Sequence, residues 1–102
     1  FPDRANISFV HQLGKNRFRV RVWERGVGIT LACGSGASAV GVAAYRAGFS
    51  GRMNDIVMDG GMVTIDWQDD GTDSGRVIMQ GPVAYVCRGH LSDELDQYLR
   101  AV

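Results

Sequence analysis

The sequence lacks long apolar runs, a net charge and paired cysteines, and each absence narrows what the protein can be. No apolar run approaches the ~20 residues of a membrane helix, and the first residues have no signal-peptide pattern, so we expect a cytoplasmic chain without a membrane partner. Eleven basic and eleven acidic residues cancel, which argues against a nucleic-acid partner. Two cysteines without CxxC or HxxxH spacing predict neither a disulfide framework nor a metal site.

What remains is typical of an ordinary folded chain with one unusual feature. A length of 102 residues suits a single domain, and 45% hydrophobic against 22% charged residues excludes a disordered chain. Glycine is unusual, because it supplies 14 residues, about twice its average share of ~7%. The positions of these glycines in the sequence are therefore the strongest indication of function.

Alternating apolar and polar residues predict an antiparallel sheet. Residues 7–13 and 17–22 form the first hairpin, in which Arg17, Arg19 and Arg21 make a solvated face. Later β-rich runs, separated by turns rich in Gly and Asp, predict a meander, in whose last strand we expect Cys87 to be buried or half-buried. These runs are 56–58, 62–67, 76–79 and 83–87.

Two helices are predicted. Residues 34–47 place Ala37, Val40, Ala44 and Ala47 on one face, and Gly48 stands where a left-handed cap ends a helix. Gly36 and Gly41 weaken this helix by about 1 kcal/mol each relative to alanine, so we expect a close approach of a neighbour or ligand there. A short amphipathic helix follows Ser92 as its cap.

The start of the first helix carries the chemistry. Cys33 immediately precedes Gly34, Ser35 and Gly36, at the end of a helix where N–H groups lack partners and the dipole is positive. The same N–H groups are expected to stabilise a thiolate at Cys33 and to donate hydrogen bonds to a ligand carboxylate, because the small side chains leave the backbone open. One helix end is thus predicted to hold a base and the carboxylate of its substrate.

Each of these residues has a plainer interpretation as well. A free cysteine such as Cys33 is often a small buried hydrophobe, and Glu24 and Arg25 at a strand end are often a solvated ion pair. A noncatalytic anion site is a further alternative, although no GK[ST] sequence follows the glycines. A cysteine hydrolase would need His11 or His90 beside Cys33.

These motifs resemble the diaminopimelate epimerase family. The resemblance rests on ERGVG at 24–28 followed by LACGSGA at 31–37, with support from FPDRAN at 1–6 and GPV at 81–83. It implies an α+β fold in which an antiparallel sheet wraps around a central glycine-rich helix, as part of a diaminopimelate epimerase-like domain. Residues 1–91 would be its C-terminal catalytic portion, and residues 92–102 a helical tail.

The resemblance also implies an activity, namely cofactor-independent conversion of LL-2,6-diaminopimelate to the meso isomer by two cysteines on opposite faces of the α-carbon. Cys33 matches one of them. By the same match Gly34 and Ser35 bind the α-carboxylate, Glu24 and Arg25 contact the substrate, and Asn6 binds its distal end. Neither pyridoxal phosphate nor a metal is implied. Proline racemase-like and phenazine-biosynthesis-like isomerases share the architecture and remain alternatives.

The second cysteine has no counterpart in these residues, since Cys87 does not match. The resemblance assigns it to a preceding N-terminal half, which we therefore expect as a partner of this portion, with a homodimer left open. The chain is accordingly expected to lack epimerase activity alone and to expose apolar surface or sheet edges.

Overall fold

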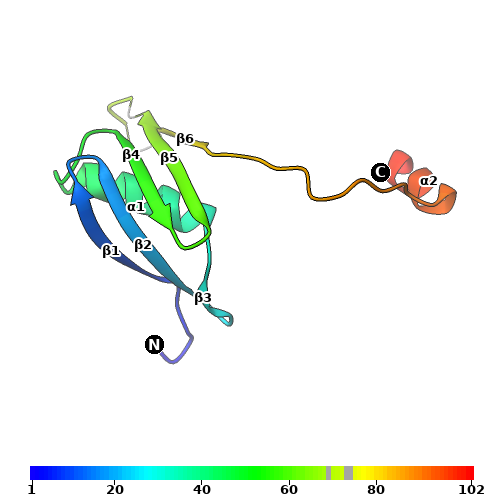
Figure 1. Ribbon diagram of the computed structural model, residues 1–102, viewed down its shortest axis with the longest axis horizontal. Coiled ribbons are helices and arrows are strands. Elements are labelled where there is room, and N and C mark those ends of the chain that lie inside the picture. The colour runs from blue at the N-terminus through cyan, green and yellow to red at the C-terminus, as the bar shows by residue number, and fades with distance from the viewer. Residues whose placement is uncertain (69, 73–74) are drawn as a thin grey trace.

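The computed structural model describes residues 1–68, 70–72 and 75–102. Within them, six strands form one sheet, helix α1 covers one of its faces, and helix α2 lies at the end of an extended segment (Figure 1). The elements are β1 (Ile7–Gly14), β2 (Arg17–Glu24), β3 (Gly28–Thr30), α1 (Gly34–Arg46), β4 (Met53–Met58), β5 (Gly61–Gln68), β6 (Arg76–Gln80) and α2 (Asp93–Ala101).

The sheet is mixed, which corrects the expected antiparallel arrangement. Its order is β1-β2-β4-β5-β6, and β3 pairs with the end of β2. Every pairing is antiparallel except that of β2 with β4, in which Phe18 lies opposite Ile56. The physical reason is α1, because a helix between two strands is the crossover that brings the second strand back in the direction of the first.

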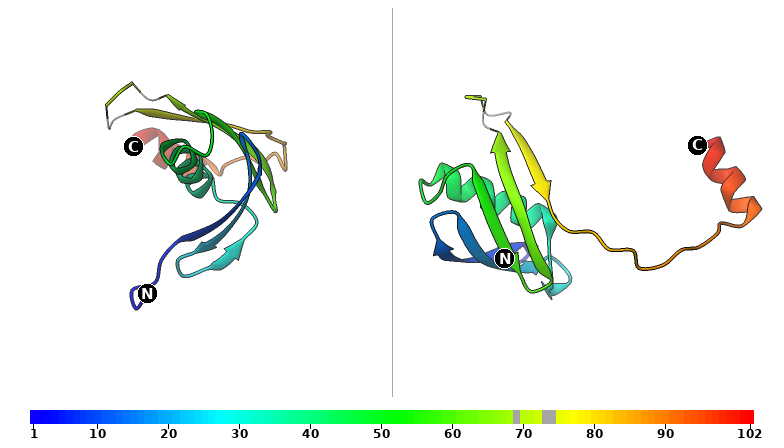
Figure 2. Two further views of the ribbon diagram at one scale, coloured as in Figure 1. Left: turned by 90° about the vertical axis from the view of Figure 1, so that its left-hand side faces the viewer. Right: turned by 45° about the horizontal axis from the view of Figure 1, so that its top comes forward.

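The core lies between the sheet and α1. Strands β1, β4, β5 and β6 all contact α1, so the sheet curves around the helix as expected (Figure 2). Strict alternation in β2 sends Phe18, Val20 and Val22 to this side, and its arginines and Trp23 to the other. The buried core residues are Phe18, Val20, Val22, Ala37, Val40, Ala44, Ile56, Met58 and Ile65.

Helix α1 has the predicted ends and the predicted tight contact. Gly48 has φ +78°, and Phe49 N–H donates to the carbonyl of Ala44, which is the arrangement of a left-handed C-terminal cap. A Cβ on Gly41 would lie only 2.7 Å from Cγ2 of Ile65, so glycine lets the helix approach β5 closely. The helix face expected to be buried is confirmed except at its last residue, Ala47, which is exposed.

The prediction of a strand at 83–87 is wrong. These residues form no strand, Val83 and Tyr85 are fully exposed, and Cys87 is exposed rather than buried. The apolar alternation is present, but a strand also needs a neighbour to accept its hydrogen bonds, and the chain leaves the sheet after β6. Helix α2 does begin after Ser92, whose Oγ accepts the N–H of Leu95 at 3.3 Å.

Candidate active site

Cys33 is the N-cap of α1. Its backbone is extended, with φ −147° and ψ 107°, and its Sγ accepts the N–H of Gly36 at 3.4 Å. The side chain is half-buried and packs against the core cluster, while Ser35 Oγ lies 3.5 Å from the sulfur. The sulfur therefore takes the position that Ser, Thr or Asp oxygen atoms usually occupy at a helix start.

The neighbouring backbone donors are available to a ligand. In the described part of the chain, the N–H groups of Gly34 and Ser35 have no hydrogen-bond acceptor, as expected for the first residues of a helix. Both groups lie at the positive end of the helix dipole. This helix start can consequently bind a carboxylate beside the thiol.

The loop that delivers Cys33 is fixed to the turn between β4 and β5. Cys33 N–H donates to Sδ of Met58 at 3.4 Å, and Gly60 N–H donates to the carbonyl of Leu31 at 2.6 Å. The same turn is fixed to β2 because both Arg19 and Arg21 pair with the carboxylate of Asp59. Hydrogen bonds from Arg19 and then Arg21 lower the pKa of Asp59 below its ordinary value of 3.8.

Glu24 and Arg25 lie where β2 ends and the chain turns into β3. Gly26, with φ +76°, and the bond from Val27 N–H to the carbonyl of Glu24 make this turn, so the expected end of the strand is confirmed. Asn6 Oδ1 accepts the backbone N–H of Arg25 at 2.6 Å. The fold thus brings Asn6 to Arg25, although the side chain of Arg25 is exposed.

Glu24 shares the inner face of β2 with the core. It follows Phe18, Val20 and Val22 at a spacing of two residues and is half-buried. Val22 in turn reaches the first turn of α1, because a Cβ on Gly36 would lie 3.2 Å from both Cγ2 of Val22 and Sγ of Cys33. The side chains of Glu24 and Cys33 therefore lie on the same side of the sheet.

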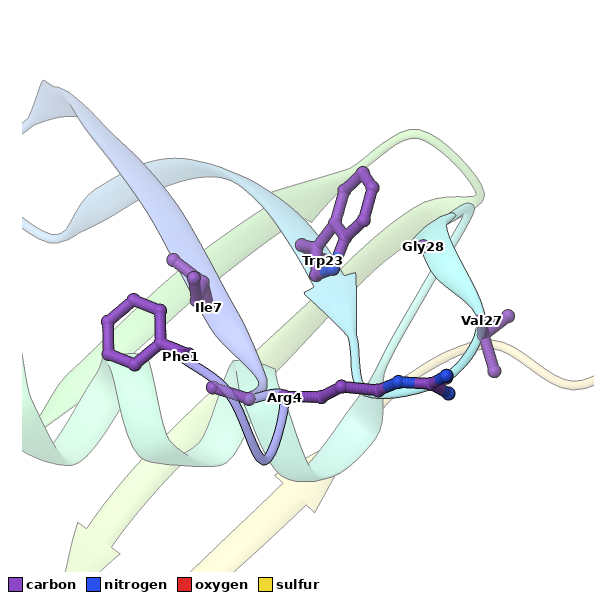
Figure 3. A pocket seen from close by; sticks show the side chains of 8 residues that line it. Phe1, Arg4, Ile7, Trp23, Val27 and Gly28 are labelled. Carbon is purple, nitrogen blue, oxygen red and sulfur yellow. The ribbon is translucent and has the colours of Figure 1, made fainter.

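The opposite face of this turn holds a pocket of about 510 Å³. It is lined by Trp23 and Gly26 to Gly28 together with the N-terminal segment, and Arg4 extends along it toward Val27 (Figure 3). None of the six residues predicted for the site lines it. This is consistent with the alternation of strand residues, which sends Trp23 and Glu24 to opposite faces.

Thr30, which was not predicted as part of the site, lies beside Glu24. Its Oγ1 donates to Oε1 of Glu24 at 2.6 Å. No local signal pointed to it, because the contact depends on the register in which β2 pairs with the three residues of β3. From the sequence alone, a threonine in a short apolar run is interpreted as an ordinary strand-forming residue.

The structure also bears on the other kinds of site considered. His11 and His90 are both exposed, and within the described residues neither hydrogen-bonds with Cys33. The described ranges contain no group of three or more His, Cys, Asp or Glu side chains placed to hold a metal ion. Among the helices in those ranges, none is both long and apolar enough to span a membrane.

Comparison with known proteins agrees with the motifs. The family model described as diaminopimelate epimerase matches residues 1–86 of the 102. The chain belongs to the diaminopimelate epimerase family.

Individual relatives show how much of the family's length is present. The diaminopimelate epimerase of Acidiphilium cryptum is 54% identical over 91 residues, which are 89% of this chain and 31% of the relative. The diaminopimelate epimerase of Bacteroides thetaiotaomicron is 50% identical over 89% of this chain and 33% of the relative. The diaminopimelate epimerase of Rhodospirillum centenum is 50% identical over 93% of this chain and 31% of the relative. The chain therefore spans about a third of the length of the relatives it matches.

Proposed function

We propose that this chain carries one half-site of a cofactor-independent amino-acid epimerase that converts LL-2,6-diaminopimelate to the meso isomer. The observation that carries the proposal is the start of α1, where the N–H of Gly36 binds the sulfur of Cys33 and the two preceding N–H groups, those of Gly34 and Ser35, lack acceptors among the described residues. A base and a carboxylate site thus lie within one helical turn. An anion site alone would not require the thiol, and the family membership supports an isomerase.

In the proposed reaction, one proton leaves the α-carbon and another arrives on its opposite face. The thiolate of Cys33 forms an S–H bond with the α-proton, and the electron pair of the broken C–H bond moves onto the α-carbon and its carboxylate. The N–H groups of Gly34 and Ser35 stabilise the charge that develops there. A second thiol, supplied from outside these residues, delivers a proton to the opposite face. The reverse direction exchanges the roles of the two thiols.

The remaining residues would bind the substrate. Glu24 is an acceptor for the α-ammonium group, and Arg25 and Asn6 at the adjacent turn contact the distal end. The amide of Asn6 is already oriented, because its oxygen accepts the N–H of Arg25 and its nitrogen therefore faces the other way. That nitrogen is a donor suited to a carboxylate.

The test is a chimera in which residues 1–91 replace the matching region of the Acidiphilium cryptum relative. In D₂O we expect deuterium to enter the α-carbon of LL-diaminopimelate. Cys33→Ala should reduce the rate by roughly 10²–10⁴-fold, the range for loss of a positioned acid–base group. Cys87→Ser is the matched control and should leave the rate unchanged, since Cys87 is exposed in the segment after β6.

Two results would contradict the proposal. Undiminished exchange in the Cys33→Ala chimera would exclude Cys33 as the acid–base group. Formation of meso-diaminopimelate by the isolated 102-residue chain would exclude the half-site, because inversion at the α-carbon requires both proton transfers.

A further inference from the structure

We propose that Thr30 is a positioning residue that holds the carboxylate of Glu24 in its substrate-binding orientation. The inference rests on the proposed function, because Glu24 is assigned there to the substrate ammonium. Thr30 itself touches no reacting atom.

The hydrogen bond between the two side chains is short and specific. Thr30 Oγ1 lies 2.6 Å from Oε1 of Glu24 and 3.4 Å from the carbonyl oxygen of Ala32. A hydroxyl has one proton to donate, and the shorter contact to a charged acceptor takes it. Both side chains are half-buried, which limits competition from water.

The strand register explains why this pair can form. Val22 lies opposite Thr30, and Glu24 lies opposite Gly28, so Thr30 and Glu24 are diagonal neighbours on the inner face. Gly28 offers no side chain as a direct partner and has φ +95°, a conformation that favours glycine. The side chain of Glu24 can therefore extend along β3 toward Thr30.

The consequence is a carboxylate with one oxygen fixed and one available. Among the described residues, Oε2 of Glu24 has no hydrogen-bond partner. A glutamate side chain has several rotamers, and binding one of its oxygens selects among them before a ligand arrives. Oε2 is then presented on the side of the sheet where α1 begins.

The first experiment uses the 102-residue chain and needs no activity. Side-chain ³J couplings of Glu24, measured by NMR, should show one dominant rotamer in the parent chain. Thr30→Val, which has nearly the same shape and lacks the hydroxyl, should average the couplings over several rotamers. Thr30→Ser should restore the single rotamer. Unchanged couplings in Thr30→Val would overturn the proposal.

The second experiment uses the chimera. Thr30→Val should reduce kcat/KM for LL-diaminopimelate about tenfold, mainly by raising KM, the pattern for a lost substrate-binding interaction, and Thr30→Ser should return it to near the parent value. Thr64→Val is the matched control, because Thr64 Oγ1 donates to Asp55 Oδ1 at 2.9 Å in a similar pair on the outer face. It should not change kcat/KM.

The two experiments separate the two proposals. Equal kcat/KM in an active parent and in Thr30→Val would overturn the positioning role while leaving the epimerase activity in place. An inactive parent chimera would overturn the proposed function. The ³J couplings of Glu24 in the isolated chain would still test whether Thr30 fixes the Glu24 side chain.

Discussion

Asp59 is a single carboxylate that connects β2 to the loop before Cys33. Arg19 and Arg21 bind it, and the next residue, Gly60, donates to Leu31 in that loop. These hydrogen bonds lower the pKa of Asp59 below 3.8 in the folded chain. The folded chain thus binds a proton here less readily than the unfolded chain, so the contact stabilises it above pH 3.8. That stabilisation is lost as the pH falls through the folded value.

Asp59→Asn should therefore lower the free energy of unfolding at pH 7. The difference from the parent should shrink as the pH falls below 3.8, where the parent carboxylate also becomes neutral. Urea unfolding at a series of pH values measures this. Asp3→Asn is the control and should show no such trend, because Asp3 is exposed and forms no ion pair among the described residues. A difference that stays constant with pH would contradict the prediction.

For single residues, the sequence predicted the position of a residue along an element better than the neighbours that the residue meets in the fold. The position of Cys33 directly before α1 was predictable, because the apolar face of residues 34–47 and Gly48 mark the helix. Thr30 was not predictable, because its importance comes from the register of β2 with β3. Cys87 was misplaced for a similar reason: its pattern indicated a strand, but burial depends on a neighbour that the pattern does not describe.

Helix α1 and β5 are in closer contact than any side chain larger than hydrogen allows at position 41. Gly41→Ala should destabilise the chain, because its Cβ would lie 2.7 Å from Cγ2 and 2.9 Å from Cβ of Ile65. Overpacking of this kind costs about 1–3 kcal/mol and exceeds or offsets the gain of up to about 1 kcal/mol in helix propensity. Urea unfolding at neutral pH measures the net effect.

Gly14→Ala is the matched control for this substitution. A Cβ there meets no atom within 4 Å, and Gly14 is not among the glycines with positive φ. Its effect should lie within about 0.5 kcal/mol, as for most exposed substitutions. If Gly41→Ala proved as neutral as Gly14→Ala, the contact between α1 and β5 would be looser than described.

Most elements were predictable because each has a strong local signal. Alternation indicated β2, and the alanine face together with Gly48 indicated α1. The three residues of β3 are too few to show a period, and they pair only because the turn at Gly26 places them beside β2. The parallel pairing of β2 with β4 joins residues far apart in the chain, so no local pattern contained it.

Across the whole molecule, the sheet with α1 and the C-terminal helix are separate structures. Every residue from Gly81 to Ser92 is exposed, and α2 has no buried residue. We therefore expect that removal of residues 92–102 changes the free energy of unfolding by less than about 0.5 kcal/mol, the usual size of surface effects. Urea unfolding of both lengths, followed by Trp fluorescence from the sheet, measures this.

The same truncation should remove only the circular-dichroism signal of α2. That signal is expected to be weak, because isolated helices shorter than about 12–15 residues are marginal in water, and α2 has nine residues. A marked loss of stability on truncation would contradict the prediction by showing that α2 packs on the sheet in solution.

Cys33 combines two duties that proteins usually give to different atoms. Its sulfur closes the first turn of α1 and, in the proposed reaction, alternates between thiolate and thiol. A thiolate is the stronger acceptor, so each arrival of a proton would loosen the cap and each departure would tighten it. The strength of the cap would then change with every turnover at the same backbone that binds the substrate. A reagent that alkylates the sulfur would weaken substrate binding by this backbone as well as block proton transfer.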